Sequence, residues 1–123
     1  MSGPPPIGLA QPPVLDVSQL VEVCGGDRDF ETLIAGEFRK ATLTALEELA
    51  QAIASRDRAR TKAWSHAIKG SSATLGGRVL AAHCQRLELL AAAEPDWADA
   101  ARLLSEIRAA YDQLDQALAA RSP

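Results

Sequence analysis

The sequence predicts an all-α protein, an up-and-down four-helix bundle with a short additional N-terminal helix. Its 123 residues are 47% hydrophobic but only 4% aromatic, and alanine and leucine dominate, a composition that favours helix over sheet. Apolar residues recur at steps of three and four between capping residues and glycines, whereas no alternating β-branched run predicts a strand. A chain of this length can bury a single core, so we expect one domain.

Residues 1–13 are expected to form a disordered, proline-rich tail. They contain Pro4-Pro5-Pro6 and Pro12-Pro13 together with glycine and few charges. Such a composition cannot sustain a helix and has little apolar surface to bury. The folded domain is therefore expected over residues 14–121.

The first helix is expected to start at Asp16, which has the chemistry of an N-cap. Gln19, three residues later, can complete a capping box with it, and Gly25-Gly26 can end the helix. A helix of this length is not stable alone, so it should pack on the bundle as a lid.

The second helix is expected to begin at a cap formed by Asp27 or Asp29 and to run to the polar segment 55–58. Its apolar residues follow helical spacing, and the predicted core stripe consists of Phe30, Leu33, Ile34, Phe38, Ala41, Ala45, Leu49 and Ile53.

The third helix is expected to carry His66 and to end at Gly76-Gly77. Its predicted buried stripe consists of Trp64, Ile68, Ser71 and Leu75. At about 100° per residue, His66 lies on the opposite, solvent-facing side. That face is small, polar and cationic, and it continues through Lys62, Lys69, Gly70, Ala73 and Gly77.

Two further helices complete the predicted bundle. One is expected from about Arg78 to Ala93, with Leu80, Cys84, Leu87 and Ala91 buried. The other follows Glu94-Pro95, and its apolar residues alternate steps of three and four, as in bundle seams: Trp97, Ala100, Leu104, Ile107, Tyr111, Leu114 and Leu118.

Charge and hydropathy exclude several classes of function. A formal charge of −3 and a pI near 5.3 argue against a nucleic-acid partner, because phosphate backbones demand clustered basic residues. No apolar run is long enough to span a membrane, and the N-terminus lacks the basic start of a signal peptide. Cys24 and Cys84 lie in apolar patterns, as small core residues do in a reducing compartment. The expected protein is a cytoplasmic monomer without membrane partners.

One run of residues singles out the third helix and the start of the fourth. His66 is followed by Lys69-Gly70-Ser71-Ser72, then by Gly76-Gly77, and the next helix carries Cys84-Gln85-Arg86-Leu87-Glu88. This pattern resembles the histidine phosphotransfer (Hpt) domain of bacterial phosphorelays, whose signature reads roughly A-H-x-L-K-G-S-S-x-x-x-G-A and continues to C-x-x-L-E. Ser65, Ile68 and Gly77 depart mildly from it. The likeness covers nearly everything after the first fourteen residues.

The resemblance implies a phosphorelay intermediate of two-component signal transduction. His66 would accept a phosphoryl group from the aspartate of a receiver domain and pass it reversibly to the receiver of another response regulator. The expected partners are receiver domains of response regulators and of a hybrid sensor histidine kinase. In the family the receiver brings the magnesium ion and the acidic pocket, so this chain is expected to be a phosphocarrier rather than an enzyme, with no cofactor or metal of its own.

The resemblance also assigns roles within the site. Nε2 of His66 would carry the phosphate while Nδ1–H donates to Glu88, and the helical wheel places Glu88 about 70° from the buried stripe of its helix, at the seam. Lys69 would supply a cation near the phosphate. The surface expected to bind the partner consists of Lys62, Gly70, Ala73, Gly77 and Gln85.

Plainer interpretations stay open for each residue. Glu88 can be merely solvated, Lys69 an ordinary surface lysine, and Gly70 a helix-packing contact. Ser71, on the predicted buried face, can bond the carbonyl of Ala67, and both serines are taken as structural. The two histidines and two cysteines match no zinc ligand set, and no nucleotide-binding motif is present.

Two other functions compete with the relay. One is a helical protein-interaction module that does not carry phosphate. The other is a phosphoacceptor domain served directly by a kinase.

Overall fold

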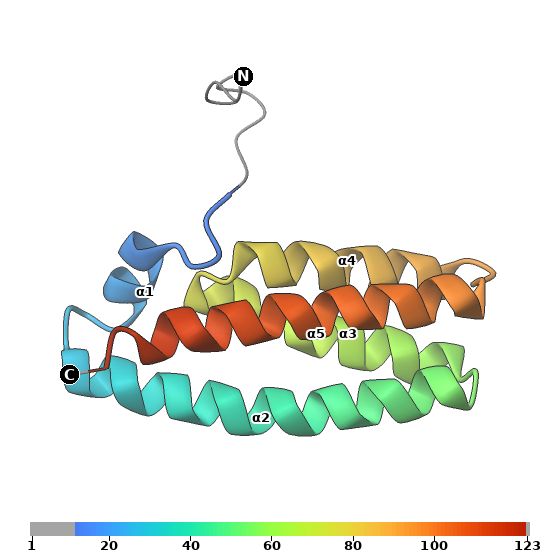
Figure 1. The fold of residues 1–123 in the computed structure, drawn as a ribbon, viewed down its shortest axis with the longest axis horizontal. Coiled ribbons are helices and arrows are strands. Elements are labelled where there is room, and N and C mark those ends of the chain that lie inside the picture. Colours follow the sequence, from blue (N-terminus) through green and yellow to red (C-terminus); the bar gives the residue numbers. More distant parts are fainter. Residues whose placement is uncertain (1–11, 123) are drawn as a thin grey trace, which may run out of the picture.

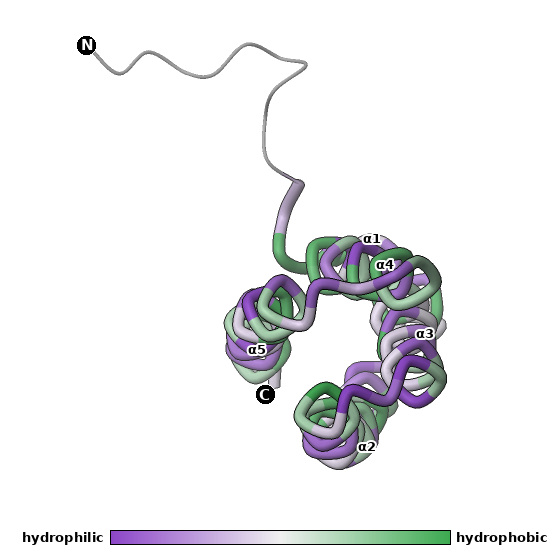
Figure 2. The backbone as a smooth tube through the Cα atoms, turned by 90° about the vertical axis from the view of Figure 1, so that its right-hand side faces the viewer, coloured by the Kyte–Doolittle hydropathy of each residue, from purple (hydrophilic) through white to green (hydrophobic). Residues whose placement is uncertain are grey.

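The computed structural model describes residues 12–122, which fold into five helices with no strand (Figure 1). A short helix is followed by four long ones: α1 (Val17–Val23), α2 (Arg28–Ala54), α3 (Arg58–Leu75), α4 (Arg78–Ala92) and α5 (Trp97–Ala119). Each long helix packs on the next, and α5 returns to α2, which closes the ring seen end-on in Figure 2. The predicted all-α bundle with a short additional N-terminal helix is confirmed.

Of the predicted tail, residues 1–13, only Pro12 and Pro13 lie within the described residues, and both are exposed. None of the described helices is both long and apolar enough to cross a lipid bilayer.

Aspartates set the start of four helices. The carboxylates of Asp16, Asp27, Asp57 and Asp96 accept backbone N–H bonds from the first turns of α1, α2, α3 and α5. Each therefore satisfies amide groups that a helix leaves without intrahelical partners. At the other end of α3, Gly76 adopts φ +93°, the left-handed conformation that ends many helices.

The core lies along the axis of the ring. Its fully buried side chains come from all five helices and include Leu20, Leu49, Ile68, Leu80, Leu87, Ile107 and Leu114. The four core positions predicted for α4 are all buried. In α5, Leu103 and Ala110 are buried in addition, while Trp97 and Leu104 are only partly buried.

The predicted stripe of α2 is wrong at several positions. Phe30, Leu33 and Ala41 are exposed. Glu31 takes the inward position of the first turns, and at about 100° per residue its neighbour Phe30 must turn outward. Further along α2, Thr42, Leu46 and Ala52 are buried.

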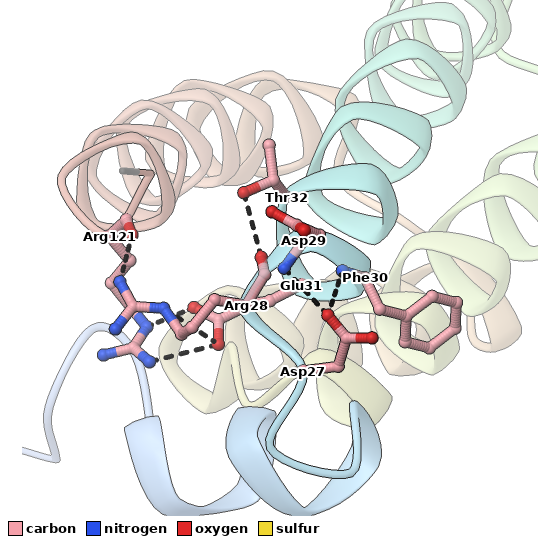
Figure 3. Close-up of polar contacts among 7 residues, drawn as sticks. All are labelled: Asp27, Arg28, Asp29, Phe30, Glu31, Thr32 and Arg121. Atoms are coloured by element: carbon pink, nitrogen blue, oxygen red, sulfur yellow. Dashed lines mark hydrogen bonds and ion pairs between the residues drawn. The ribbon is translucent and has the colours of Figure 1, made fainter.

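Glu31 faces inward because Arg121, just after α5, pairs with it (Figure 3). Arg121 donates from Nε to Oε1 and from Nη2 to Oε2, the latter at 3.1 Å, and Arg28 donates to the backbone carbonyl of Arg121. The bond from Arg121 lowers the pKa of Glu31 despite burial of the carboxylate. This cluster joins the end of α5 to the start of α2.

The lid helix α1 is fastened to the turn between α3 and α4. The backbone N–H of Asp16 donates to the carbonyl of Gly76 at 2.8 Å, and a Cβ on Gly76 would lie 2.6 Å from the carbonyl oxygen of Asp16. Gln19 does not complete the predicted capping box with Asp16. Its amide donates instead to the carbonyls of Ala73 and Thr74 in the last turn of α3.

Candidate functional site

The exposed face of α3 is set by which residues face the core. Thr61, Ser65, Ile68, Ser72 and Leu75 are buried. The hydroxyls of Thr61, Ser65 and Ser72 donate to carbonyls one turn back, so each buried hydroxyl of α3 has a partner. The predicted buried stripe of α3 is therefore wrong at two positions. Its Ser71 is exposed and Trp64 only partly buried, because each stands one residue from the true inward position.

His66 follows the buried Ser65 and turns outward, with 66% of its side chain exposed. Its Nδ1 lies 2.9 Å from Oε2 of Glu88 on α4, whose side chain is only 15% exposed. The two residues meet because α3 and α4 are antiparallel neighbours joined by the short Gly76-Gly77 turn. Glu88 is thus not a freely solvated carboxylate.

Lys69 reaches the same carboxylate from the other side. Its Nζ lies 2.6 Å from Oε1 of Glu88 and donates to Oε1 of Gln85 at 2.9 Å. The bond from Lys69, followed by that from His66, lowers the pKa of Glu88, although burial opposes the shift. The predicted mobile cation is thus held beside the imidazole, anchored by two residues of α4.

The negative charge on Glu88 determines which nitrogen of the His66 imidazole carries a proton. An ionised carboxylate only accepts hydrogen bonds, so Nδ1 of His66 must be the donor. In a neutral ring the other nitrogen, Nε2, then carries the free lone pair. The arrangement presents one nucleophilic nitrogen on an exposed side chain.

The surface around His66 contains most of the predicted binding residues. Lys62, Gly70, Ala73 and Gln85 are exposed. A Cβ built on Gly70 would meet nothing within 4 Å, so the interpretation of Gly70 as a helix-packing contact is wrong. Ala73 lies at the end of this face, and its carbonyl is bonded by Gln19.

Gly77 does not share this surface. It is buried at the N-cap of α4, where an added Cβ would lie 2.5 Å from Cδ2 of Leu114. Its predicted place on the His66 face assumed that the helical turn continues, but α3 ends at Leu75. We therefore assign Gly77 to close packing of α4 on α5.

The histidines, cysteines and carboxylates also raise the question of a metal site. Among residues 12–122, no three of the His, Cys, Asp and Glu side chains are grouped so as to hold a metal ion. Both cysteines are free and buried, and burial, with a smaller contribution from Glu88, raises the pKa of Cys84 to about 12.

A family model for the Hpt domain matches residues 34–117, which include His66, Lys69 and Glu88. The chain belongs to the Hpt domain family. Hpt domains are the histidine-containing phosphotransfer modules of two-component signalling. No curated protein and no solved structure gave a significant match.

Sequence reasoning missed one feature of this Hpt domain. A shallow hollow of about 460 Å³ opens beside His66, lined by Ala59, Lys62, Ala63, His66 and Glu88. Ala59 and Ala63 precede the histidine by seven and three residues, so their place on its face could have been read from helical spacing. Because the chain is rich in alanine, two alanines beside the histidine did not stand out as candidate site residues.

Proposed function

We propose that this Hpt domain is a phosphorelay intermediate. His66 accepts a phosphoryl group from the aspartate of a receiver domain and passes it reversibly to the receiver of another response regulator. The observation that carries the proposal is the bond between Nδ1 of His66 and Glu88, which leaves Nε2 of an exposed ring free for attack.

The chemical step balances on the residues of this site and one acyl phosphate. The lone pair of Nε2 attacks phosphorus, the bond from phosphorus to the aspartate oxygen breaks, and its electron pair returns to the receiver as a carboxylate. The ring becomes a phosphorylated imidazolium whose proton stays on Nδ1. Glu88 orients the ring and stabilises that positive charge. In the reverse step the same carboxylate holds the same proton.

Lys69 and Gly70 serve the transferred group in different ways. The ammonium of Lys69 lies next to the ring, where it can follow a phosphoryl group that carries up to about −2 charge. Gly70 leaves open space one turn after His66, so the receiver's backbone can approach closely. Lys62 and Gln85 add polar contacts at the edge of that docking surface, and Ala73 marks its end.

The domain is a phosphocarrier, and catalysis of transfer comes mainly from the partner receiver or kinase. We place it in the bacterial cytoplasm as a monomer that exchanges phosphate between a hybrid sensor histidine kinase and a response regulator. The alternative, an interaction module that carries no phosphate, is disfavoured by the charged network around an exposed histidine.

Purified receiver domains encoded in the same genome, labelled with radioactive phosphate on their aspartate, test the proposal. We expect transfer of the label to this chain, as an acid-labile and fairly base-stable phosphohistidine at His66. Absence of transfer from every receiver would refute the relay. Labelling by a kinase domain that lacks a receiver would instead favour direct phosphorylation by a kinase.

A further inference from the structure

Two of the residues that line the hollow beside His66 have small side chains. Ala59 and Ala63 contribute only methyl groups, and both residues are exposed. Because they stand seven and three residues before His66, they extend its face toward the start of α3. A larger side chain at either position would fill the space that these methyl groups leave.

The hollow combines apolar and charged lining residues. Besides the two alanines, it is lined by Lys62, Glu88 and the imidazole of His66. Glu88 is already paired with Lys69 and His66. Within the described residues, no ion pair engages Lys62. Apolar contact area next to polar and cationic groups is the composition of a protein-binding surface.

We propose that this hollow receives an aliphatic side chain of the docked receiver domain, and that the small size of Ala59 and Ala63 determines which receivers bind. The inference rests on the proposed function, since it names a contact made during the same docking event. His66 is itself a wall of the hollow, so any receiver that brings an acyl phosphate to Nε2 also covers the hollow. A partner side chain that fills it excludes water beside the reacting group and anchors the complex.

The test fills the hollow by substituting larger side chains for its two alanines. Ala63→Leu and Ala59→Leu add a branched side chain with little change in helix propensity, and Ala63→Ser adds one atom. The matched control is Ala101→Leu, at an exposed position of α5. We expect the leucine variants to weaken receiver binding by at least about tenfold, the loss of one buried aliphatic contact, with Ala63→Ser nearer the parent and Ala101→Leu equal to it.

A small phosphodonor separates docking from reactivity. Phosphoramidate transfers its phosphoryl group to an imidazole nitrogen with release of ammonia, and it needs no docking surface. The inference requires that Ala63→Leu lose transfer from the receiver at least about tenfold more than labelling by phosphoramidate. Equal losses with both donors, or parental binding in both leucine variants, would overturn it. If receivers never phosphorylate the parent while phosphoramidate labels His66, the proposed relay has failed instead.

Discussion

The molecule contains two histidine–glutamate pairs with the same topology and opposite exposure. His66 on α3 pairs through Nδ1 with Glu88 on α4, and His83 on α4 faces Glu106 on α5 through Nδ1. In the first pair the histidine is 66% exposed and the glutamate 15%, whereas in the second the values are 24% and 38%.

The two pairs also differ in geometry and neighbours. Nδ1 of His66 is 2.9 Å from its carboxylate, but Nδ1 of His83 is 3.7 Å away and makes no hydrogen bond. Glu88 is shared with Lys69, next to the ring, while Glu106 is shared with Arg102. Under the proposed assignment of His66, a nearby carboxylate is not sufficient for a phosphoacceptor. The proposal also requires an exposed ring that is bonded at one nitrogen and free at the other.

The largest effect should come from the histidines themselves. We expect His66→Gln to abolish phosphoryl acceptance while helicity and melting stay nearly parental, because substitutions at exposed positions usually change stability by less than about 0.5 kcal/mol. His83→Gln, the matched control, should accept phosphate as the parent does. Label that persists in His66→Gln but disappears in His83→Gln would reverse the assignment of the two pairs.

The second-largest effect on transfer should come from removing the lysine beside His66. Lys69→Ala should slow transfer by about ten- to several-hundred-fold, because a charge contact worth about 1 kcal/mol when exposed can reach about 4 kcal/mol in a site covered by the partner. Arg102→Ala, at the corresponding cation of the second pair, should not change the rate. Single-turnover transfer from a phosphorylated receiver measures both, and a parental rate in Lys69→Ala would mean that the partner alone holds the phosphate.

Replacing the glutamate of each histidine–glutamate pair shows whether only one of the two carboxylates affects transfer. Glu88→Ala should slow transfer by about tenfold, since the ring loses its orientation and a contact on the order of 1 kcal/mol. Glu106→Ala should leave the rate unchanged. A positioning role also predicts a change in the imidazole tautomer ratio, which nitrogen NMR measures. An unchanged ratio in Glu88→Ala would show that Glu88 does not hold the Nδ1 proton.

The two histidines also differ in the residue one turn later, and we expect a smaller effect on receiver binding from changing it. Gly70 follows His66 in open space, whereas Leu87 follows His83 in the core. Gly70→Gln should weaken receiver binding several-fold through added bulk, while helicity is kept or improved, because glycine is a poor helix former. Calorimetric titration and circular dichroism together test this, and unchanged binding would remove the argument for close approach.

The smallest expected effect is a titration shift. The carboxyl of Glu88 should titrate below its ordinary pKa of 4.5, chiefly because of Lys69. A lowered pKa in the folded state means that its contribution to stability is present above the unfolded value and is lost as pH falls through the folded value. Glu88→Gln should therefore lose less stability than the parent under acid. Carbon-detected NMR reads the pKa, and a value at or above the ordinary one would contradict the ion pair.

Local sequence features predicted most of the helix ends correctly. Aspartate caps and the glycine pairs act within a few residues, so Asp27 and Gly76 mark their boundaries without help from the rest of the fold. Helical spacing likewise placed the core of α4, where no buried charge intervenes. It failed at Glu31, because the inward carboxylate is stabilised chiefly by Arg121, which lies 90 positions away in the sequence.

The sequence by itself determined the helical class, the caps of the first two helices, and the spacing that puts Lys69 and Gly70 within one turn of His66. These depend on interactions between near neighbours in the chain. Only the tertiary structure decided that Glu88 serves both His66 and Lys69, that Gly77 is packed against Leu114, and that His83 is shielded while His66 is open. The physical reason is that each depends on how one helix is rotated against the next, and that rotation is set by packing of the whole core.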